Sequence, residues 1–531
     1  DEDDEEELKV KKFNVKCAIV WGREGMFNDK VLGEHAFGEF HVDTPEVDNG
    51  NKAPPNIPSR PLNQEQYDAA RKQWQEMIDQ GMLVPSKSPW GAPIVMVRKP
   101  NGRGWRMCLD YRAGNAVAVK QHYPLPLVQD TLDKIGNAKF FTSLDCLKAF
   151  WQIRNSPETQ PKTAINFPWG KFECTRMPMG MQAASATFQR IMDVMIRDID
   201  FCVGFVDDIL IFSHTWEDHL AHVACVLDRV GGAGLVFDPS KCEIGKSSTK
   251  FLGVIVAADG NRPDPDKIST VKDAEFPPDR KTMHSWVALL NYYARHIPEF
   301  AIITTPLQAY IHEKPHKDKN GKFVWHPASQ EVRDAFDKLK AALVGDLVLA
   351  RPDYTKQFIL TVDAAKKIGG AGAILSQIND EGRDCPIAYW SVRWIDSAAN
   401  WSPVEHECYA FRRATEQFSD YLSGAKFQVY TDSEPLVWVQ SLRRPKGHMA
   451  EWILELQSLD FDVAHIPGSA NIGSDTLSRL ALDQREMQSN RRNIALNQKF
   501  FEGDEDSDTL VSASSVSPEA QPRTDTPRSV S

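Results

Sequence analysis

Hydrophobic and polar positions along the chain follow two periods, one typical of strands and one typical of helices. Short apolar runs bounded by turn residues predict strands, for example GAPIVMV (91–97), FILTVD (358–363) and KFQVYTD (426–432). Longer stretches repeat apolar positions three and four residues apart and predict helices, for example QEQYDAARKQWQEMIDQGML (64–83). Strands and amphipathic helices are mixed through the middle of the chain, which indicates α+β or α/β domains.

The run GFVDDILIF (204–212) departs from this pattern, because two adjacent carboxylates, Asp207 and Asp208, lie inside an apolar strand. A buried carboxylate is costly unless it is paired, neutralised or bound to a cation. Taken alone, the dipeptide fits the tip of a β-hairpin equally well, since Asp tolerates turn geometry. Upstream, KFFTSLD (139–145) predicts a strand that ends at Asp145. Three carboxylates at neighbouring strand ends would suit two hard cations, which promote in-line phosphoryl transfer.

A second set of carboxylates follows residue 350. Asp363 ends one predicted strand, with GAGAILSQ (370–377) as its hairpin partner, and Asp432 ends another strand. Asp475 follows Ser474, which we expect to be the N-cap of a helix. An acid in that first turn is also expected for helix-dipole reasons alone, so Asp475 by itself indicates no metal site.

The segment SPVEHECYAFRRATEQFSDYL (402–422) predicts a helix in which two glutamates differ in position. The apolar stripe of this helix consists of Val404, Phe411, Ala414 and Phe418. Glu407 falls on this stripe, whereas Glu405 does not. A glutamate on the buried side of a helix needs a reason, and a metal shared with neighbouring carboxylates would supply one.

Composition is that of a globular protein, with 42% hydrophobic and 25% charged residues among 531, enough for three or four domains. Acidic runs at 1–7 and 502–508 carry twelve of the acids. Without them the net charge of −11 would be +1, so the body is close to neutral and the acidic runs do not argue against a polyanionic partner. Nine cysteines without a CxxC pair favour a reducing, intracellular setting. The N-terminal Asp indicates a fragment or processed product, and we expect neither a signal peptide nor a membrane helix.

Six blocks between residues 56 and 310 resemble, in order, the reverse transcriptase of gypsy-type (Metaviridae) LTR retrotransposons. They lie at 81–115, 122–153, 163–192, 205–213, 241–256 and 289–300. The resemblance implies a right-handed polymerase with fingers, palm and thumb. Asp145, Asp207 and Asp208 match its metal-binding triad, which two Mg²⁺ or Mn²⁺ ions would occupy. Lys99 and Arg106 match the fingers cations that hold the incoming deoxynucleotide triphosphate.

The sugar-side aromatic of the family is matched by Phe150, and other positions depart from the family pattern. Relatives usually have Tyr where this chain has Phe205, so one hydroxyl is lost while aromatic packing is kept. Met179 in MPMG replaces the usual Phe of MPFG, and QAASATF (182–188) lacks the usual Asn and Pro. We therefore expect the fold to be retained and activity to be modestly impaired.

The second set of carboxylates resembles the D-E-D-D site of ribonuclease H, and HIPGSANIGSDTLSR (465–479) resembles the gypsy-type form of its final block. His448 and Glu451 stand where relatives often carry Arg before a Trp, and the mobile-loop His of cellular enzymes has no counterpart. The resemblance implies two Mg²⁺ ions and hydrolysis of RNA in a hybrid. The matching residues are Asp363, Glu407, Asp432 and Asp475.

The resulting hypothesis is an α+β reverse transcriptase followed by an α/β ribonuclease H-like domain. Expected divisions are an acidic or loose N-terminal segment (1–55), fingers and palm (56–275), thumb and linking segment (276–345), ribonuclease H (346–482) and a disordered tail (483–531). The implied activity is RNA-directed DNA synthesis with removal of the RNA strand. The implied partners are an RNA or DNA template-primer, an RNA–DNA hybrid and dNTPs, and no membrane is implied. The chain would be part of a polyprotein in which a protease and an integrase flank it, and it would be located in a cytoplasmic particle.

Two other interpretations stay open. A degenerate or domesticated copy could bind nucleic acid without catalysis, although all seven candidate carboxylates are present. A non-LTR or intron-type enzyme is the other, although the block ending SDTLSR favours the LTR class. The alternating acids of AADGNRPDPD (257–266) lack a Glu at the twelfth position, so we predict a hairpin turn there rather than a calcium loop.

Overall fold

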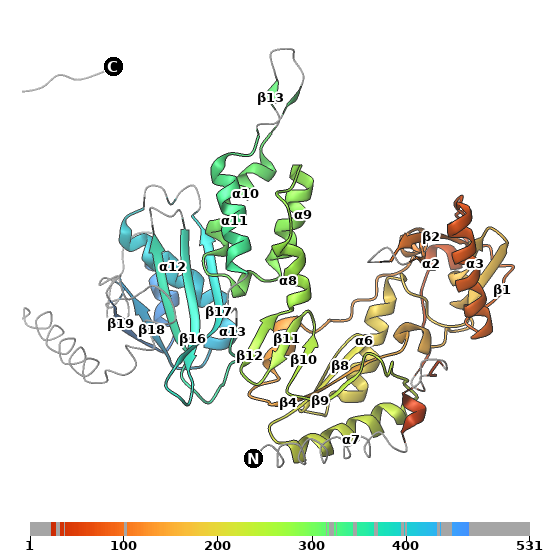
Figure 1. Ribbon diagram of the computed structural model, residues 1–531, viewed down its shortest axis with the longest axis horizontal. Coiled ribbons are helices and arrows are strands. Elements are labelled where there is room, and N and C mark those ends of the chain that lie inside the picture. Colours follow the sequence, from red (N-terminus) through yellow and green to blue (C-terminus); the bar gives the residue numbers. More distant parts are fainter. Residues whose placement is uncertain are drawn as a thin grey trace, which may run out of the picture.

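The protein is described by a computed structural model of residues 23–466. The ranges left out within it are 28–31, 35, 37, 100–103, 315, 318–322, 325–326, 344–347, 366–369, 395–397, 399–400, 433–435 and 437–448. Figure 1 shows two sheet-containing bodies with a column of helices between them. The first body carries the expected fingers and palm, and the second carries the expected ribonuclease H-like domain.

The fingers are a five-stranded sheet with strand order β1-β6-β5-β2-β3. Helix α3 (Gln64–Asp79) starts at a capping box on Asn63 and packs on this sheet, where Gln73 exchanges hydrogen bonds with the backbone of Trp105 (3.1 Å) and Met107 (3.0 Å). The strands are β1 Leu83–Pro85, β2 Ala92–Arg98, β3 Trp105–Leu109, β5 Ile165–Phe167 and β6 Gly170–Cys174. Short helices nearby are α2 Pro45–Asp48, α4 Arg112–Asn115 and η4 Gln160–Thr163.

The palm is a four-stranded antiparallel sheet with strand order β7-β8-β4-β9, covered on one face by α6 (Ala183–Ile196) and α7 (Trp216–Gly232). Ile209 and Ile211 of β8 pack toward these helices, while Leu210 and Phe212 pack on the opposite face. Burial on both faces explains why this strand reads as a continuous apolar run. The remaining elements are β4 Phe140–Asp145, β7 Cys202–Phe205, β8 Asp208–Ser213, β9 Glu243–Lys246, α5 Val128–Asp133 and η3 Ala149–Gln152.

The expectation of a loose segment up to residue 55 is wrong for residues 40–48. Phe40 is fully buried and Val42 is 3% exposed, and both belong to the core of the palm and fingers. The backbone at Phe40 also bridges to Asn155. Because the surrounding sequence is rich in Pro and polar residues, two isolated apolar side chains gave no periodic signal. Residues 40–48 therefore belong to the folded polymerase body.

A small antiparallel sheet, β10-β11-β12, leads from the palm to the helical column. The turn at Ala258 and Asp259 joins β11 to β12, which confirms the predicted hairpin at AADG. The column that follows has its own core, formed by Val271, Leu290, Leu307 and Leu339 among others. The strands of the small sheet are β10 Ser248–Phe251, β11 Val254–Ala257 and β12 Gly260–Pro263. The elements of the column are α8 Pro265–Lys272, α9 Arg280–Asn291, η5 Ala294–His296, α10 Phe300–His312 and α11 Gln330–Ala342, and the short strands β13 His316–Lys317 and β14 Phe323–Val324 lie between α10 and α11 in sequence.

The second body is a five-stranded mixed sheet with strand order β17-β16-β15-β18-β19. Strands β15, β18 and β19 run parallel, and β15, β16 and β17 form an antiparallel meander. Helix α12 packs on β15 and β16, with Phe411 and Ala414 in the core between them. The elements are β15 Ile359–Ala365, β16 Gly370–Ile378, β17 Asp384–Arg393, α12 Pro403–Gln417, α13 Ser419–Leu422, β18 Phe427–Thr431, α14 Met449–Gln457 and β19 Phe461–His465. No helix in the described part of the chain combines the length and apolarity needed to cross a membrane.

Candidate active sites

The tip of the β7–β8 hairpin is formed by Val206 and Asp207. Val206 has a φ of +52°, an outlier for a β-branched residue that persists only where its surroundings hold it. Gln189 of α6 provides that support: its Oε1 accepts a hydrogen bond from Val206 N (2.7 Å) and its Nε2 donates to Gly204 O (3.2 Å). The acidic dipeptide thus lies at the tip of a β-hairpin, which was one of the two interpretations of the sequence. The backbone of this tip is held in a strained conformation.

Strand pairing brings the three palm carboxylates together. Asp145, at the end of β4, is the cross-strand partner of Asp208, at the start of β8, and Asp207 precedes it in the turn. Burial, reinforced by the neighbouring carboxylates, raises the pKa of Asp208 to about 6, and burial likewise raises the pKa of Asp207. Partly desolvated carboxylates that repel one another indicate a site suited to positive charge.

A lysine to which sequence reasoning gave no role contacts this site. Lys241 Nζ lies 2.9 Å from Asp145 Oδ1 and 3.8 Å from Asp238 Oδ2. Its hydrogen bond to Asp145 raises the pKa of Lys241. A lysine beside a strand is usually only solvated, so its position in the chain gave no signal. With Asp145 engaged in this way, the oxygens of the three palm carboxylates do not gather within 4.8 Å of one another.

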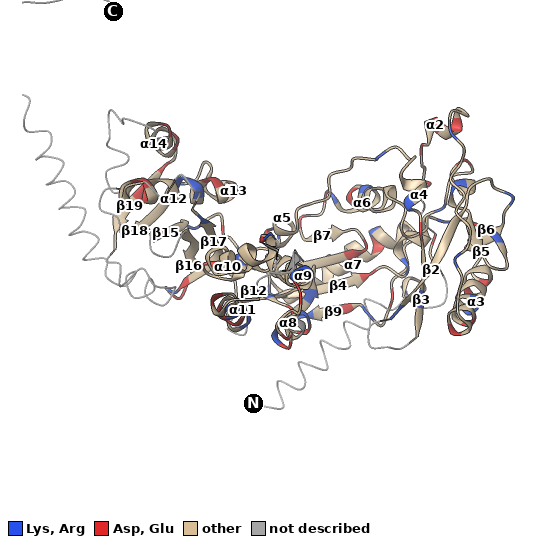
Figure 2. Cartoon of the chain, turned by 90° about the horizontal axis from the view of Figure 1, so that it is seen from above, with Lys and Arg blue, Asp and Glu red and all other residues tan. Residues whose placement is uncertain are grey.

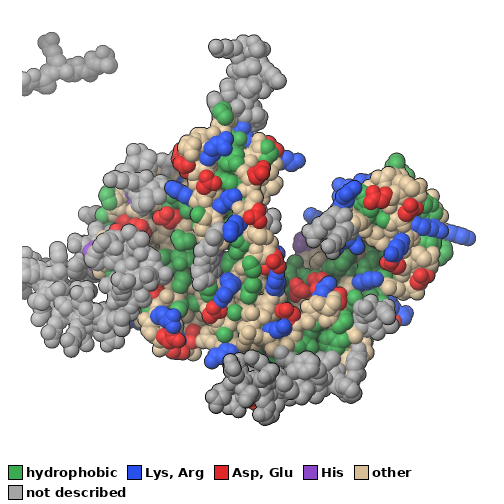
Figure 3. Space-filling model, viewed as in Figure 1, with side chains coloured by type: hydrophobic (Ala, Val, Ile, Leu, Met, Phe, Trp, Pro, Cys, Tyr) green, Lys and Arg blue, Asp and Glu red, His purple; other side chains and the backbone are tan. Residues whose placement is uncertain are grey.

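The two expected nucleotide-binding cations lie on the β2–β3 hairpin of the fingers. Val97 and Arg106 are cross-strand partners, and Lys99 N donates to Gly104 O (3.0 Å) two residues further along. Because side chains alternate along a strand, Lys99 and Arg106 are diagonal neighbours on one face. Both are exposed. Figure 3 shows a hollow between the fingers and the helical column, with acidic atoms on its floor.

Phe150 lies in η3, five residues after Asp145, and is half-buried. Its ring meets that of Phe188 edge-on, with centroids 5.8 Å apart. Met179 is 51% exposed, so it lies on the surface of the protein. The roles of these residues toward a nucleotide stay predictions.

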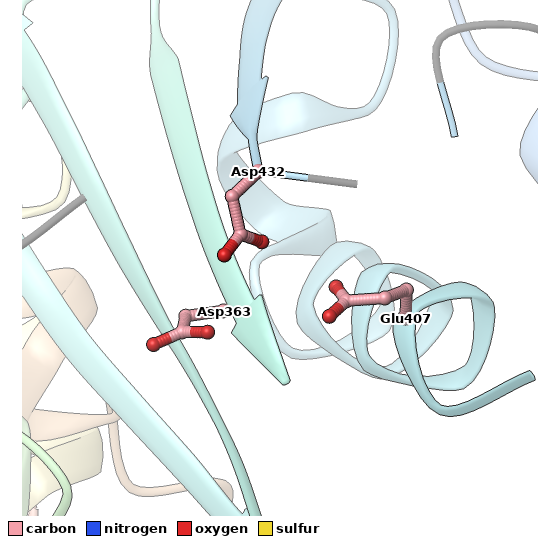
Figure 4. Close-up of side chains that lie close together, drawn as sticks. All are labelled: Asp363, Glu407 and Asp432. Carbon is pink, nitrogen blue, oxygen red and sulfur yellow. The ribbon is translucent and has the colours of Figure 1, made fainter. Parts of the chain in front are cut away.

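The second site gathers three of the four predicted carboxylates (Figure 4). Asp363 lies on β15, Asp432 directly follows β18, and Glu407 reaches them from α12. One ligand oxygen from each lies within 4.8 Å of the other two. Parallel pairing of β15 with β18 places the two aspartates side by side, because Thr361 is in register with Tyr430. Oxygen ligands at this spacing fit a hard divalent cation.

The two glutamates of α12 differ as their positions on the helix predict. Glu407 is 8% exposed, and its Oε2 has no hydrogen-bond partner within the described residues. Burial and the charges of Asp432 and Asp363 raise the pKa of Glu407 to about 8. Glu405 instead completes the capping box with Ser402, whose backbone N donates to Glu405 Oε2 (2.5 Å). An unpaired buried carboxylate beside two others fits a metal ligand, and Glu405 fits a structural role.

A further carboxylate approaches from the helical column. Glu299 precedes α10 and has a φ of +54°. Its charge adds to burial and to Asp432 in raising the pKa of Asp363. Nothing in the sequence block around Glu299 distinguishes it, so its role could not be predicted from the sequence.

Three other residues singled out in the sequence lie outside this cluster of described side chains. Asp475 and His448 lie outside the described residues, and Glu451 is exposed in the first turn of α14.

Family comparisons match both bodies. Residues 97–256 match the family described as reverse transcriptase (RNA-dependent DNA polymerase), and residues 353–459 match the RNase H-like domain found in reverse transcriptase. Among solved structures, a foamy viral protease-reverse transcriptase in complex with double-stranded DNA superposes with a TM-score of 0.73 at 20% identity, covering 86% of this chain and 94% of that one. This likeness shows the fold. The chain thus contains a reverse transcriptase domain joined to a ribonuclease H-like domain, two domain classes that generally depend on divalent metals.

Sequence relatives narrow the class further. The Pol polyprotein of transposon 297 from Drosophila melanogaster is 34% identical over 430 residues, covering 80% of this chain and 39% of the relative. That of transposon gypsy from the same species is 30% identical over 445 residues, with coverages of 80% and 42%. The Tf2-3 polyprotein of Schizosaccharomyces pombe is 30% identical over 436 residues, with coverages of 81% and 32%. The chain belongs to the gypsy-type LTR retrotransposon Pol family, and it spans about two fifths of the length of the first two relatives.

Proposed function

We propose that this chain copies retrotransposon RNA into DNA at the palm and hydrolyses the RNA of the resulting hybrid at the second site, with Mg²⁺ at both. The observation that carries the proposal is the pair of separate carboxylate clusters at strand ends, one in each matched domain. In both, burial and mutual repulsion raise carboxylate pKa values, which favours binding of cations over leaving the charges uncompensated.

At the palm, Asp145, Asp207 and Asp208 would hold the metal. Bound Mg²⁺ supplies Lewis-acid activation of the primer 3′-hydroxyl and neutralises charge on the transferred phosphoryl group. The chain fixes where the carboxylates stand: Gln189 holds the turn, and the β4–β8 pairing holds Asp145 opposite Asp208. Lys241 compensates the charge of Asp145 and would have to release this carboxylate before it could bind a metal.

The fingers and η3 would select the incoming nucleotide. Lys99 and Arg106, on one face of a hairpin, offer cationic donors to a triphosphate. Phe150 would lie beneath the sugar and exclude a 2′-hydroxyl by steric contact. The two cations would thus contribute to binding of the nucleotide, and the Phe150 ring would contribute to selectivity for deoxyribonucleotides.

At the second site, Asp363, Glu407, Asp432 and Asp475 would hold Mg²⁺, which when bound activates water against an RNA phosphodiester. Recognition of the hybrid would rest on its backbone shape and 2′-hydroxyls rather than on base sequence. Glu407 is held in place by the burial of its helix face against β15 and β16.

We further propose that the chain is released from a Pol polyprotein flanked by protease and integrase and works in a cytoplasmic particle. The resemblance to Pol polyproteins that are much longer than this chain supports this context. Western blotting of element-derived particles with an antibody to residues 64–79 would test it. A band at the size of an unflanked chain in the cytoplasmic fraction is expected, and only full-length polyprotein or nuclear signal would contradict it.

Primer extension tests the proposed activity. A labelled DNA primer on an RNA template, with dNTPs and Mg²⁺, should be extended, and the template RNA should be cut in the newly formed hybrid. Both products should vanish when EDTA removes the metal. Binding of template-primer without extension in either Mg²⁺ or Mn²⁺ would instead support a chain that binds nucleic acid without catalysis.

A further inference from the structure

A single buried arginine joins the second body to the first. Arg351 is 6% exposed, and its guanidinium donates hydrogen bonds to Ala257 O (2.6 Å), Ala138 O (3.4 Å), Asn261 Oδ1 (3.2 Å) and Gly136 O. These acceptors come from two places in the polymerase body, the segment before β4 and the β11–β12 hairpin. A planar guanidinium with several fixed acceptors restrains orientation as well as distance.

The backbone beside Arg351 is fixed to the same hairpin. Leu349 and Asn261 exchange backbone hydrogen bonds of 2.8 and 2.9 Å. The approach is so close that a Cβ at Gly260 would lie 2.3 Å from Leu349 O, which glycine with its φ of +137° avoids. The chain is therefore clamped to the palm side immediately before it enters the second body.

Other contacts hold the second body from further positions. Tyr421 Oη donates to Asp133 Oδ2 of α5 (2.6 Å). On the side of the helical column, Ala301 N at the start of α10 donates to Ser391 Oγ of β17 (2.8 Å). Figure 2 shows α10 lying between the β16–β17 edge and α9. The orientation of the second sheet is thus set by contacts to both the palm and the thumb, and Arg351 is the buried charged residue among them.

We propose that Arg351 is a positioning residue that fixes how far behind the growing primer end the RNA strand is cut. This inference rests on the proposed function. One duplex that leaves the palm site and reaches the second site is cut at a place set by the separation and orientation of the two bodies. Successive positions along a strand are about 3.4 Å apart, so a movement of a few ångströms shifts the cut by one position.

Loss of the guanidinium would remove four hydrogen bonds and free the second body to move on its remaining contacts. The polymerase carboxylates and the cluster of Asp363, Glu407 and Asp432 are in other parts of the two bodies, so each site keeps its own geometry. The expected defect is in where the RNA is cut, with the chemistry of both sites retained.

The test uses the full chain and an RNA template labelled at its 5′ end, annealed to a DNA primer whose 3′ end cannot be extended. Wild-type chain should give one dominant cut at a fixed distance from the primer end. Arg351→Ala and the milder Arg351→Lys should spread the cuts over several positions, and Tyr421→Phe should do so to a smaller degree. Arg383→Ala, at an exposed arginine of the same body paired with Glu381, should cut as wild type does.

Two measurements separate failure of this inference from failure of the proposed function. Cleavage of a long hybrid without a nearby primer end, and primer extension on RNA, report the two activities regardless of spacing. A wild-type cut position in Arg351→Lys that retains both activities overturns the inference. Should Arg351→Ala fail to fold, Arg351→Lys and Tyr421→Phe decide the matter alone, and a single sharp cut in both overturns the inference. Absence of both activities in the wild-type chain would overturn the proposed function as well.

Discussion

Two glutamates two residues apart on α12 lie on different faces of the helix and have different surroundings. Glu407 is buried beside Asp363 and Asp432, whereas Glu405 caps its own helix. The apolar stripe predicted this difference from sequence, because a charged residue on a buried face conflicts with its surroundings. Lys241 and Glu299 could not be found in this way, since each lies at a surface position in the sequence pattern and gains its role only from strands or helices distant along the chain.

Glu407→Gln should stabilise the metal-free protein at alkaline pH. Burial raises the pKa of Glu407 from 4.5 to about 8, so its contribution to stability is fully present below about pH 4.5 and is lost as pH rises through about 8. A neutral amide removes that loss, and thermal unfolding at pH 9 should occur at a higher temperature than in wild type. Added Mg²⁺ should raise the unfolding temperature of wild type more than that of the variant. Glu405→Gln is the control and should respond to Mg²⁺ as wild type does; an equal Mg²⁺ response in Glu407→Gln would contradict the ligand assignment.

Phe150→Ala should relax the choice between deoxyribonucleotides and ribonucleotides. Removing the ring opens space where a 2′-hydroxyl would clash, and each 1.4 kcal/mol of lost clash is worth about tenfold in discrimination. Separate kcat/KM values for dNTP and rNTP measure the ratio. Phe188→Leu, at the fully buried ring that Phe150 meets, should lower both values in parallel. An unchanged ratio in Phe150→Ala would leave it a packing residue only.

At the scale of elements, the sequence predicted strands that are bounded by turns and carry an unusual residue at one end. The strand end at Asp145 and the β15–β16 hairpin are confirmed, and Asp432 directly follows β18. The predicted strand end at Asp363 is wrong by two residues, because β15 continues to Ala365 in its pairing with β16. What could not be predicted depends on contacts between distant segments, such as the burial of Phe40 against the palm core. Gln189 is an intermediate case: like Glu407 it is a polar residue on a buried helix face, and the same argument would have found it.

Gln189→Leu should disturb the β7–β8 turn and with it DNA synthesis. The substitution leaves Val206 N without its acceptor and costs about 1–3 kcal/mol of stability. Because Val206 has an unfavourable φ, relaxation of the turn would displace Asp207. The kcat/KM for primer extension should fall while hybrid cleavage is unaffected. Gln75→Leu, on the exposed face of α3, serves as control. Wild-type extension by Gln189→Leu would contradict the role given to this side chain.

At the scale of the whole molecule, a cavity of about 920 Å³ lies between the two bodies and is lined by residues of both. Asp133 of the first body and Tyr421 of the second body are among these residues. Asp133 accepts from Tyr421, and burial raises the pKa of Asp133 from 3.8 to about 6, against the opposing effects of Tyr421 and Arg295. Its contribution to stability is therefore present below about pH 4 and is lost as pH rises through about 6.

Asp133→Asn should remove this part of the pH dependence. Denaturant unfolding of wild type and variant between pH 4 and 7 measures the difference in unfolding free energy at each pH. The variant should become relatively more stable as pH rises through 6. Asp420→Asn, in the same cavity lining, is the matched control and should leave the slope of wild type unchanged. A constant difference between wild type and Asp133→Asn across this range would show that Asp133 does not titrate there.

The central claim is that one chain holds two chemically independent acidic sites. A single assay on an RNA template with a labelled DNA primer and a separately labelled RNA strand tests it, comparing wild type with Asp207→Asn and Asp432→Asn. Asp207→Asn should abolish primer extension and leave cleavage of a preformed hybrid intact, and Asp432→Asn should do the reverse. Loss of both activities in either variant, or extension at the wild-type rate by Asp207→Asn, would contradict the assignment of the two sites.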